Sequence, residues 1–360
     1  MIIKPLQRAV MQAGRLLRLP AAWRARPGYF APKAWDRIEP ASIALVACHW
    51  IGDTLWATQV VPALRERFGD RPIFAITRPL CRDIWHGLLP DERVLTAGAV
   101  ISDRRRERVS WRAIAAEASA LRARQFDLVI DLMGNRYSAA FTFLLRPDCS
   151  LGFDGGELGW LYSHRVADAE RPAEHLRCRP FRVIEPLLET AGAARGLTGL
   201  IRPPAPTGDG TALAAELGLT GRPFAVLAPG AGWPAKQWPP EQFIELGQNL
   251  AGRGWSCAVA GSTSEGPLCH RVAAEIAPDA CELIGRPLGE IVSLLGLAAG
   301  VAANDSGIAH LAAALGRPTA AIFTGATDPR RCGPIGPAAK VFVAPVEAAA
   351  VAEFLLSASP

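Results

Sequence analysis

Short apolar runs recur along the chain from Ser42 onward, and most of them are followed by a segment with helical spacing of apolar residues. Apolar runs bounded by Gly, Pro or Asn are typical of buried strands, whereas apolar positions three and four residues apart predict helices. Strands that alternate with helices predict a parallel, doubly wound α/β fold. The expected strands cover residues 42–48, 71–77, 91–97, 126–132, 222–230, 255–261, 281–285, 301–304, 318–325 and 340–345. The main expected helices cover 111–124, 135–145, 175–191, 240–254, 288–300, 308–316 and 346–356, and residues 146–174 are expected to form loops.

The chain is expected to form two α/β domains. Its 360 residues exceed the size at which one hydrophobic core usually stops growing. The best linker is the Pro- and Gly-rich stretch RPPAPTGDG at 202–210. We therefore expect an N-terminal arm at 1–40, a first domain at 41–200, a second domain at 201–345, and a C-terminal helix at 346–360 that packs back across the domain junction.

The N-terminal arm has the pattern of a basic amphipathic helix. Apolar residues fall at 6, 9, 10, 13, 16 and 17, while Lys4, Arg8, Arg15 and Arg18 stay off that stripe. Four aromatic residues follow: Trp23, Tyr29, Phe30 and Trp35. This pattern favours a membrane-surface anchor formed by residues 1–35. A helix docked on the protein's own body and a mitochondrial presequence both remain open.

Charge and cysteine usage exclude several classes. Residues 1–40 carry eight basic and two acidic residues, whereas the remainder carries 31 basic and 32 acidic residues. Because the body is near neutral, a nucleic-acid-binding body is not expected. The eight cysteines form no C-x-x-C pair, which argues against a zinc site or a disulfide framework and suits a reducing compartment. No run of 18 apolar residues occurs.

The stretch VAANDSGIAHLAAALGRP at 301–318 predicts a strand, a tight turn and a helix. Asp305 is expected to cap the helix, which would leave the backbone N–H groups of Ser306 and Gly307 free to bind an anion such as phosphate. His310 lies one turn later on the same face. A capped helix with a buried histidine is the structural alternative.

A second candidate site is Gly52-Asp53, directly after the first expected strand. Ligands of open α/β sheets bind at the carboxyl ends of strands. Gly52 would let the backbone approach a substrate, and Asp53 is suited to taking a proton from an acceptor hydroxyl. The alternative role for Asp53 is helix capping. His49 is an acceptor-side candidate, and a core histidine is the structural alternative.

The loop APGAGWPAKQWP at 228–239 follows the first strand of the second domain. It contains a G-x-G-x-x-A string, but its prolines prevent a helix from opening there, so a dinucleotide fingerprint is excluded. It is expected to be a rigid loop in which Gly230 and Gly232 expose amides and Lys236 binds a diphosphate. A solvated surface lysine is the alternative.

Glu265 begins the helix after the next strand, where it could accept hydrogen bonds from a nucleoside. A glutamate at a helix start also needs no function. No D-x-D pair occurs in the chain, so neither a metal nor a cofactor is expected.

The order of these elements resembles glycosyltransferase family 9, the ADP-heptose:lipopolysaccharide heptosyltransferases. The likeness rests on the Gly52-Asp53 turn, the P-G…A-K-x-W-P loop and the D-S-G-x-x-H-x-A-A-A-L-G-x-P segment. It implies a GT-B architecture, in which two Rossmann-like domains face each other across a cleft, and inverting transfer without a metal. By motif match, Asp53 resembles the catalytic base, and Lys236 with the turn at Asp305 resembles the diphosphate site. The chain departs from the family at His49-Trp50, at Pro62 and at Gly232-Trp233.

The resemblance implies a bacterial enzyme at the cytoplasmic face of the inner membrane. It would move a sugar, heptose from ADP-heptose, to a lipopolysaccharide or related glycolipid. Its expected partners are the nucleotide-sugar, the glycolipid acceptor and the membrane surface. Two alternatives remain open: another GT-B enzyme such as a nucleotide-sugar epimerase, which needs no acceptor, and a non-catalytic sugar-nucleotide-binding protein, in which Asp53 would be dispensable.

Overall fold

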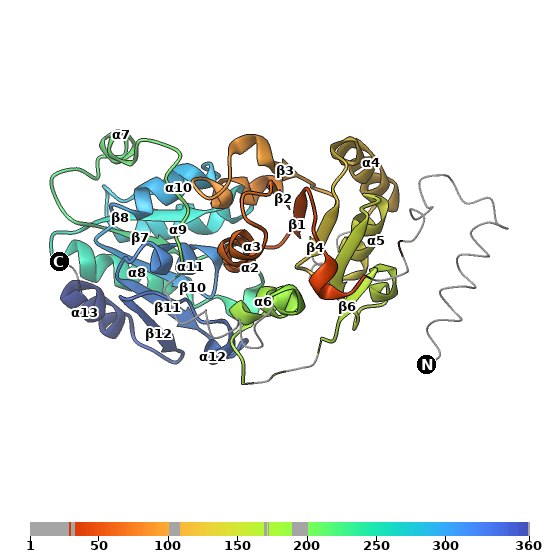
Figure 1. The fold of residues 1–360 in the computed structure, drawn as a ribbon. Coiled ribbons are helices and arrows are strands. Elements are labelled where there is room, and N and C mark those ends of the chain that lie inside the picture. The colour runs from red at the N-terminus through yellow and green to blue at the C-terminus, as the bar shows by residue number, and fades with distance from the viewer. Residues whose placement is uncertain are drawn as a thin grey trace.

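The computed structural model describes residues 29, 33–100, 109–168, 171, 173–188 and 201–358. Two six-stranded, all-parallel sheets form two lobes (Figure 1). Their strand orders are β3-β2-β1-β4-β5-β6 and β12-β11-β10-β7-β8-β9, which is the same doubly wound topology used twice. The predicted α/β alternation is confirmed.

Most strands of the first lobe are buried at their centres. Their sequences are rich in aliphatic and β-branched residues, which form strands here because their side chains fill both faces of a parallel sheet. The strands are β1 (Ile43–Ala47), β2 (Ile73–Thr77), β3 (Val94–Thr96), β4 (Leu128–Asp131), β5 (Cys149–Phe153) and β6 (His164–Val166). The helices are α2 (Ile51–Thr58), α3 (Val60–Phe68), α4 (Trp111–Leu121), α5 (Arg136–Leu144) and α6 (Arg179–Ile184), with 3-10 turns η2 (Trp35–Arg37), η3 (Pro79–Trp85), η4 (Asp91–Arg93), η5 (Arg122–Arg124), η6 (Gly159–Leu161), η7 (Leu176–Cys178) and η8 (Glu185–Leu187).

The second lobe repeats this plan. Its strands are β7 (Phe224–Ala228), β8 (Ser256–Gly261), β9 (Cys281–Ile284), β10 (Gly300–Asn304), β11 (Thr319–Phe323) and β12 (Ala339–Val343). Its helices are α7 (Gly210–Glu216), α8 (Pro240–Ala251), α9 (Gly266–Ile276), α10 (Leu288–Leu295), α11 (Gly307–Ala314), α12 (Pro329–Cys332) and α13 (Ala348–Ala358), with 3-10 turns η10 (Pro234–Lys236) and η11 (Thr263–Glu265).

The two lobes share an apolar core at their junction. One buried cluster runs from Trp56 of α2 and Trp85 of η3 to Leu288 of α10 and Leu311 of α11. Helix α2 packs on α11, and η3 packs on α10. Since burial of apolar surface is the main stabilising term in folding, this shared core holds α2 of the first lobe against α11 of the second.

Two sequence expectations are wrong. The region expected to form loops at 146–174 contains β5 and β6, which were missed because β5 includes a serine and a glycine and β6 includes polar residues. The C-terminal helix was expected to cross the domain junction. Instead, α13 packs on α8 and on β10 and β11 of its own domain, because its apolar face completes the core on that side of the sheet.

The end of the predicted arm docks on the first lobe at Tyr29. This side chain is 4% exposed, and its ring lies edge-on to Phe143 with 5.8 Å between centroids. Its hydroxyl donates to the carbonyl of Leu161 at 3.0 Å and also contacts the hydroxyl of Ser150. Tyr29 is therefore a core residue and not the membrane-interface aromatic that was expected.

Trp35 also packs on the protein body. Its ring lies 4.9 Å from that of His164, whose Nε2 is 3.0 Å from the carbonyl oxygen of Lys33. Two of the four predicted interfacial aromatics thus belong to the fold. The predicted amphipathic helix, Trp23 and Phe30 lie outside the described residues. In the described part of the chain, no helix combines the length and apolar character needed to cross a bilayer.

Candidate active site

The candidate residues of both lobes gather where the sheet topology reverses. In the first sheet β1 and β4 are neighbours, and the helices that follow them, α2 and α5, enter different core clusters. In the second sheet β7 and β10 are likewise neighbours, and the helices that follow them, α8 and α11, enter different core clusters. Ligands of doubly wound sheets bind at these switch points. Gly52 and Asp53 follow β1, the Lys236 loop follows β7, and Ser306 follows β10.

A buried asparagine, missed in the sequence analysis, joins the two loops of the second lobe. Asn304 ends β10, and its Nδ2 donates to the carbonyl of Pro229 at 2.8 Å. Its Oδ1 accepts from the backbone N–H of Trp238 at 2.9 Å. Because one amide holds both ends of the loop, it fixes Lys236 relative to the start of α11. A polar residue ending an otherwise apolar strand was the only sequence signal.

Lys236 is paired with Asp305. Its Nζ lies 2.5 Å from Oδ2 of Asp305, with side chains only 12% and 7% exposed, and 4.2 Å from the ring centre of Trp233. Thr327 donates to the same carboxylate oxygen at 2.6 Å. The expectation that Asp305 caps α11 is wrong, because its carboxylate is used by Lys236 and Thr327 and Ser306 occupies the N-cap position.

The start of α11 offers unused hydrogen-bonding groups. Ser306 makes no side-chain capping bond, and the helix begins at Gly307. Among the described residues, Ser306 Oγ and His310 Nδ1 are buried without a partner. The first N–H groups of a helix lack partners within it, and its dipole favours an anion there. The arrangement fits the phosphate site predicted from the sequence.

Helices α2 and α11 meet at their N-termini through two glycines. A Cβ on Gly52 would lie 2.7 Å from Cδ2 of His310, and one on Gly307 would lie 2.5 Å from Cβ of Ile51. Carbon atoms do not approach this closely, so the contact requires glycine at both positions. Burial lowers the pKa of His310 to about 4, although nearby carboxylates, Asp53 among them, raise it. The imidazole is therefore neutral at physiological pH.

Asp53 is the third residue of α2 and is half-buried. Within the described ranges its carboxylate makes no hydrogen bond or ion pair, and Trp50, at the N-cap position, gives no side-chain cap. Helix capping, the structural alternative for Asp53, is therefore not its role. The carboxylate is free to accept a proton next to the start of α11.

His49 connects the two loops at the first switch point. Its Nε2 lies 3.3 Å from the carbonyl oxygen of Leu132, which follows β4. Burial lowers the pKa of the imidazole. His49 thus supports the wall of the site through a backbone contact.

The loop after β4 is a part of the site that the sequence analysis missed. Asp131 accepts from the hydroxyl of Tyr162 at 2.5 Å and from the backbone N–H of Met133 at 2.8 Å. Arg179 donates to the carbonyl of Met133 at 2.7 Å and to Asp168 at 2.9 Å. An aspartate at the end of the strong strand FDLVIDL was the available signal.

Glu265 has a local structural role beside the lysine loop. Its carboxylate accepts from the backbone N–H of Ser262 at 2.8 Å and from the hydroxyl at 2.6 Å, which closes a capping box. A Cβ on Gly230 would lie 2.1 Å from its Oε1, so the glycine lets these segments meet. Gly232 is exposed, and a Cβ built on it would meet no atom within 4 Å.

Trp56, also missed, links the lobes next to the site. Its ring centroid lies 5.0 Å from that of His310 and 5.3 Å from that of His175, both in edge-on geometry. Nε2 of His175 is 3.0 Å from the carbonyl oxygen of Gly333 in the second lobe. These contacts hold α2 and α11 at a fixed separation.

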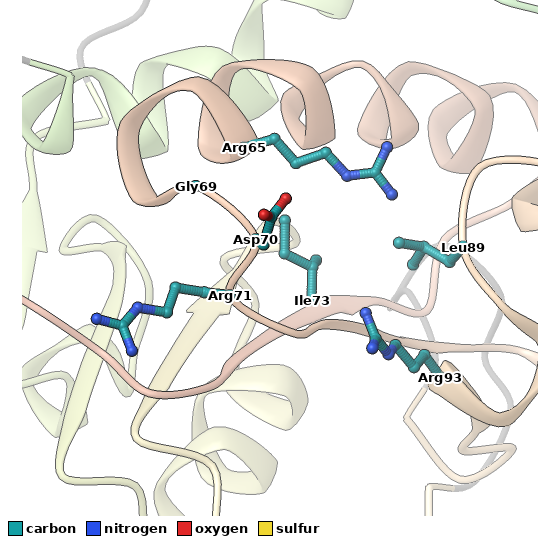
Figure 2. Close-up of a pocket in the computed structure, with 7 residues that line it drawn as sticks. All are labelled: Arg65, Gly69, Asp70, Arg71, Ile73, Leu89 and Arg93. Atoms are coloured by element: carbon teal, nitrogen blue, oxygen red, sulfur yellow. The ribbon is translucent and has the colours of Figure 1, made fainter.

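A separate hollow lies at the opposite edge of the first sheet (Figure 2). It lies between the end of α3 and the start of β2, at the edge of the sheet where the strands begin. The candidate site residues lie at the other edge, where the strands end. No predicted site residue lines it, so it is not part of the candidate active site. Its lining residues are Arg65, Gly69, Asp70, Arg71, Ile73, Leu89 and Arg93.

The described residues include no group of three or more His, Cys, Asp or Glu side chains placed to hold a metal ion. All eight cysteines are free thiols.

Two doubly wound sheets whose switch points meet across a domain junction define a GT-B fold. The structure is similar to that of E. coli ADP-heptose LPS heptosyltransferase II, with a TM-score of 0.74 at 20% identity over 88% of this chain and 98% of that chain. It is also similar to E. coli heptosyltransferase WaaC with ADP, with a TM-score of 0.64 at 25% identity over 88% of this chain and all of that chain (100%). The predicted GT-B architecture is confirmed.

The chain belongs to glycosyltransferase family 9 (heptosyltransferase), whose family model matches residues 114–354. It is 25% identical over 318 residues to lipopolysaccharide heptosyltransferase 2 of Salmonella typhimurium, covering 83% of this chain and 87% of that protein. It is 33% identical over 126 residues to lipooligosaccharide heptosyltransferase 2 of Haemophilus influenzae, covering 33% of this chain. That second match spans only 36% of the Haemophilus protein.

Proposed function

We propose that the chain is an inverting glycosyltransferase that moves heptose from ADP-heptose to a lipopolysaccharide or related cell-envelope glycolipid. One observation carries this proposal: the unpartnered carboxylate of Asp53 in the described structure lies beside His310, at the unpaired start of α11. A base on one lobe and an anion site on the other suit a direct displacement, in which the nucleophile attacks opposite the leaving group.

In the proposed reaction Asp53 takes the proton of an acceptor hydroxyl as its oxygen bonds to the anomeric carbon of the donor. The bond from that carbon to the diphosphate oxygen breaks, and its electron pair stays with the leaving nucleoside diphosphate. Lys236 and the first N–H groups of α11 stabilise the negative charge that grows there. No metal is needed in this scheme, because the protein supplies the positive charge.

The donor and acceptor are inferred from relatives. E. coli heptosyltransferase WaaC has been solved with ADP and with ADP-2-deoxy-2-fluoro heptose. The Salmonella relative is named for lipopolysaccharide. These names support ADP-heptose as donor and a lipopolysaccharide-type acceptor for this chain.

The donor assignment can be tested by the melting temperature of the protein with a panel of nucleotides. A ligand at 100 times its Kd stabilises the folded state by about 2.7 kcal/mol. ADP and ADP-heptose are expected to raise the melting temperature, whereas UDP- and GDP-sugars at the same concentration are not. Stabilisation by a UDP- or GDP-sugar alone would overturn the assignment.

We also propose that the arm before Tyr29 holds the enzyme on the inner face of the inner membrane. Each basic residue near an anionic surface contributes about 1 kcal/mol, and Lys4, Arg8, Arg15 and Arg18 lie on one segment. Because Tyr29 is anchored in the first lobe, removing residues 1–28 should leave the fold intact. The full chain is expected to sediment with anionic vesicles at low salt, and the shortened chain is not. Equal sedimentation of both proteins would assign the arm a different role.

Gly52→Ala is expected to lower the turnover number strongly and the free energy of unfolding only slightly. The added Cβ would lie 2.7 Å from the buried ring of His310, so α2 and α11 must separate. A displacement of about 1 Å at a reacting centre lowers rates about 100-fold. Steady-state kinetics and calorimetry measure the two effects. The matched control is Gly266→Ala at the start of α9, where the nearest atom to the new Cβ is 3.6 Å away and both properties should be kept. Normal turnover in Gly52→Ala would show that the lobe contact does not set the reacting geometry.

A further inference from the structure

Arg78 and Trp50 lie at the same edge of the first sheet as Asp53. Arg78 follows β2 and Trp50 follows β1, two parallel neighbours paired at Ala47 and Thr77. Trp50 also immediately precedes α2, the helix that carries Asp53. Both side chains therefore belong to the acceptor-side wall of the candidate site.

The Arg78 guanidinium is held in place, and no described residue forms an ion pair with it. Its central carbon lies 4.2 Å from the centre of the Trp50 ring. In the described part of the chain the guanidinium makes no hydrogen bond or ion pair, and its Nη1 is buried without an acceptor. A guanidinium offers five N–H donors, and a buried charged donor without an acceptor is unfavourable. Stacking on an indole fixes its plane without using any of these donors.

Three acidic side chains of the first lobe are already used by other partners. Asp131 is bound by Tyr162 and the loop after β4, and Glu117 accepts from the backbone N–H groups of Gly98 and Ala99 at 3.0 Å. Asp83 accepts from the backbone N–H of Gly289 at 2.8 Å.

The thiol of Cys81, which lies close to Arg78 and Trp50, supplies no negative charge either. Cys81 Sγ lies 3.5 Å from the carbonyl oxygen of His49, the residue before Trp50. Burial raises the pKa of this thiol to about 11. In the described part of the first lobe the Arg78 guanidinium thus forms no ion pair, and the nearby carboxylate left without a partner is that of Asp53, the proposed base.

We propose that Arg78, stacked on Trp50, binds an anionic group of the acceptor, a carboxylate or a phosphate, close to the hydroxyl that Asp53 deprotonates. The two anions of the reaction are then divided between the lobes: the donor diphosphate at Lys236 and α11, and the acceptor anion at Arg78. A planar guanidinium binds a carboxylate or phosphate through two parallel hydrogen bonds, which would fix the orientation of the acceptor as well as its affinity. This inference rests on the proposed transfer to a glycolipid acceptor.

The test compares three acceptors with wild type and variants. The acceptors are heptose-free lipopolysaccharide as isolated, the same material after phosphatase treatment, and the same material after chemical reduction of its carboxylates. Arg78→Gln is expected to raise the acceptor KM about 10- to 100-fold, with the ADP Kd unchanged. Arg78→Lys should restore part of the loss, because it keeps the charge but not the paired hydrogen bonds.

The two treated acceptors identify which anionic group of the acceptor Arg78 binds. Wild type should lose the same 10- to 100-fold on whichever treated acceptor lacks the recognised group, and Arg78→Gln should add no further loss there. The matched control is Arg82→Gln, four residues on, which is exposed and donates to the carbonyl of Asp91 at 3.2 Å; it should behave as wild type. A loss in Arg78→Gln that is equal on all three acceptors, or no loss at all, overturns the inference. Failure of wild type to transfer to any acceptor would instead refute the proposed function.

Discussion

Asp53→Asn is expected to reduce turnover by about 10²- to 10⁴-fold, the range of a typical general base. Asparagine has nearly the shape of aspartate but cannot take the acceptor proton. The substitution should leave the ADP Kd nearly unchanged, since the proposed diphosphate site is formed by Lys236 and α11 and not by Asp53. It should change stability by less than about 1 kcal/mol, because in the described structure the half-buried carboxylate makes no hydrogen bond or ion pair.

The matched control for this substitution is Asp70→Asn. Asp70 is an exposed carboxylate of the same lobe at the opposite edge of the sheet, so turnover should not change. Single-turnover rates with saturating donor and acceptor separate chemistry from binding. Turnover of Asp53→Asn within threefold of wild type would falsify the assignment of the base.

Lys236→Ala is expected to weaken ADP-heptose binding by about one to two orders of magnitude. A hydrogen bond to a charged group contributes about 1.5–3 kcal/mol, and the substitution removes the cation closest to the proposed diphosphate. It also leaves the carboxylate of Asp305, 7% exposed and bound then only by Thr327 among the described residues, to repel the donor. Titration calorimetry with ADP measures the loss.

Lys340→Ala is the control for Lys236→Ala. Lys340 lies on β12 of the same lobe, is exposed, and contacts the rings of Phe342 and Phe354. Its removal should leave the ADP Kd unchanged. Circular dichroism must show that Lys236→Ala is folded, because breaking a largely buried ion pair also lowers stability. Equal ADP affinity in folded Lys236→Ala and Lys340→Ala would remove Lys236 from the donor site.

Much of the fold could be predicted because its strands are continuous apolar runs. The turns after β1, β7 and β10 carried the candidate residues, and topology then brought those turns to two switch points. Strands β5 and β6 could not be predicted in the same way. They include polar residues such as Ser150 and His164, which are buried by contacts with Tyr29 and Trp35 from the N-terminal segment.

The partners of the site residues depend on contacts distant in sequence. The sequence indicated Lys236 and Asp305 separately, but their pairing follows from the way Asn304 holds the loop against α11. The fit of Gly52 against His310 joins residues of different lobes, so no local pattern could reveal it. The patterns that predict strands and helices are local in the sequence, whereas the partners of a site side chain depend on how distant segments pack together.

The proposed transfer of a heptosyl residue from ADP-heptose to a glycolipid can be measured by mass spectrometry of heptose-free lipopolysaccharide incubated with the protein and ADP-heptose. We expect the acceptor to gain the mass of one heptosyl residue and one equivalent of ADP to be released for each addition. Without the acceptor, the donor should not be consumed. An unchanged acceptor, or conversion of ADP-heptose without any acceptor, would contradict the proposed transfer.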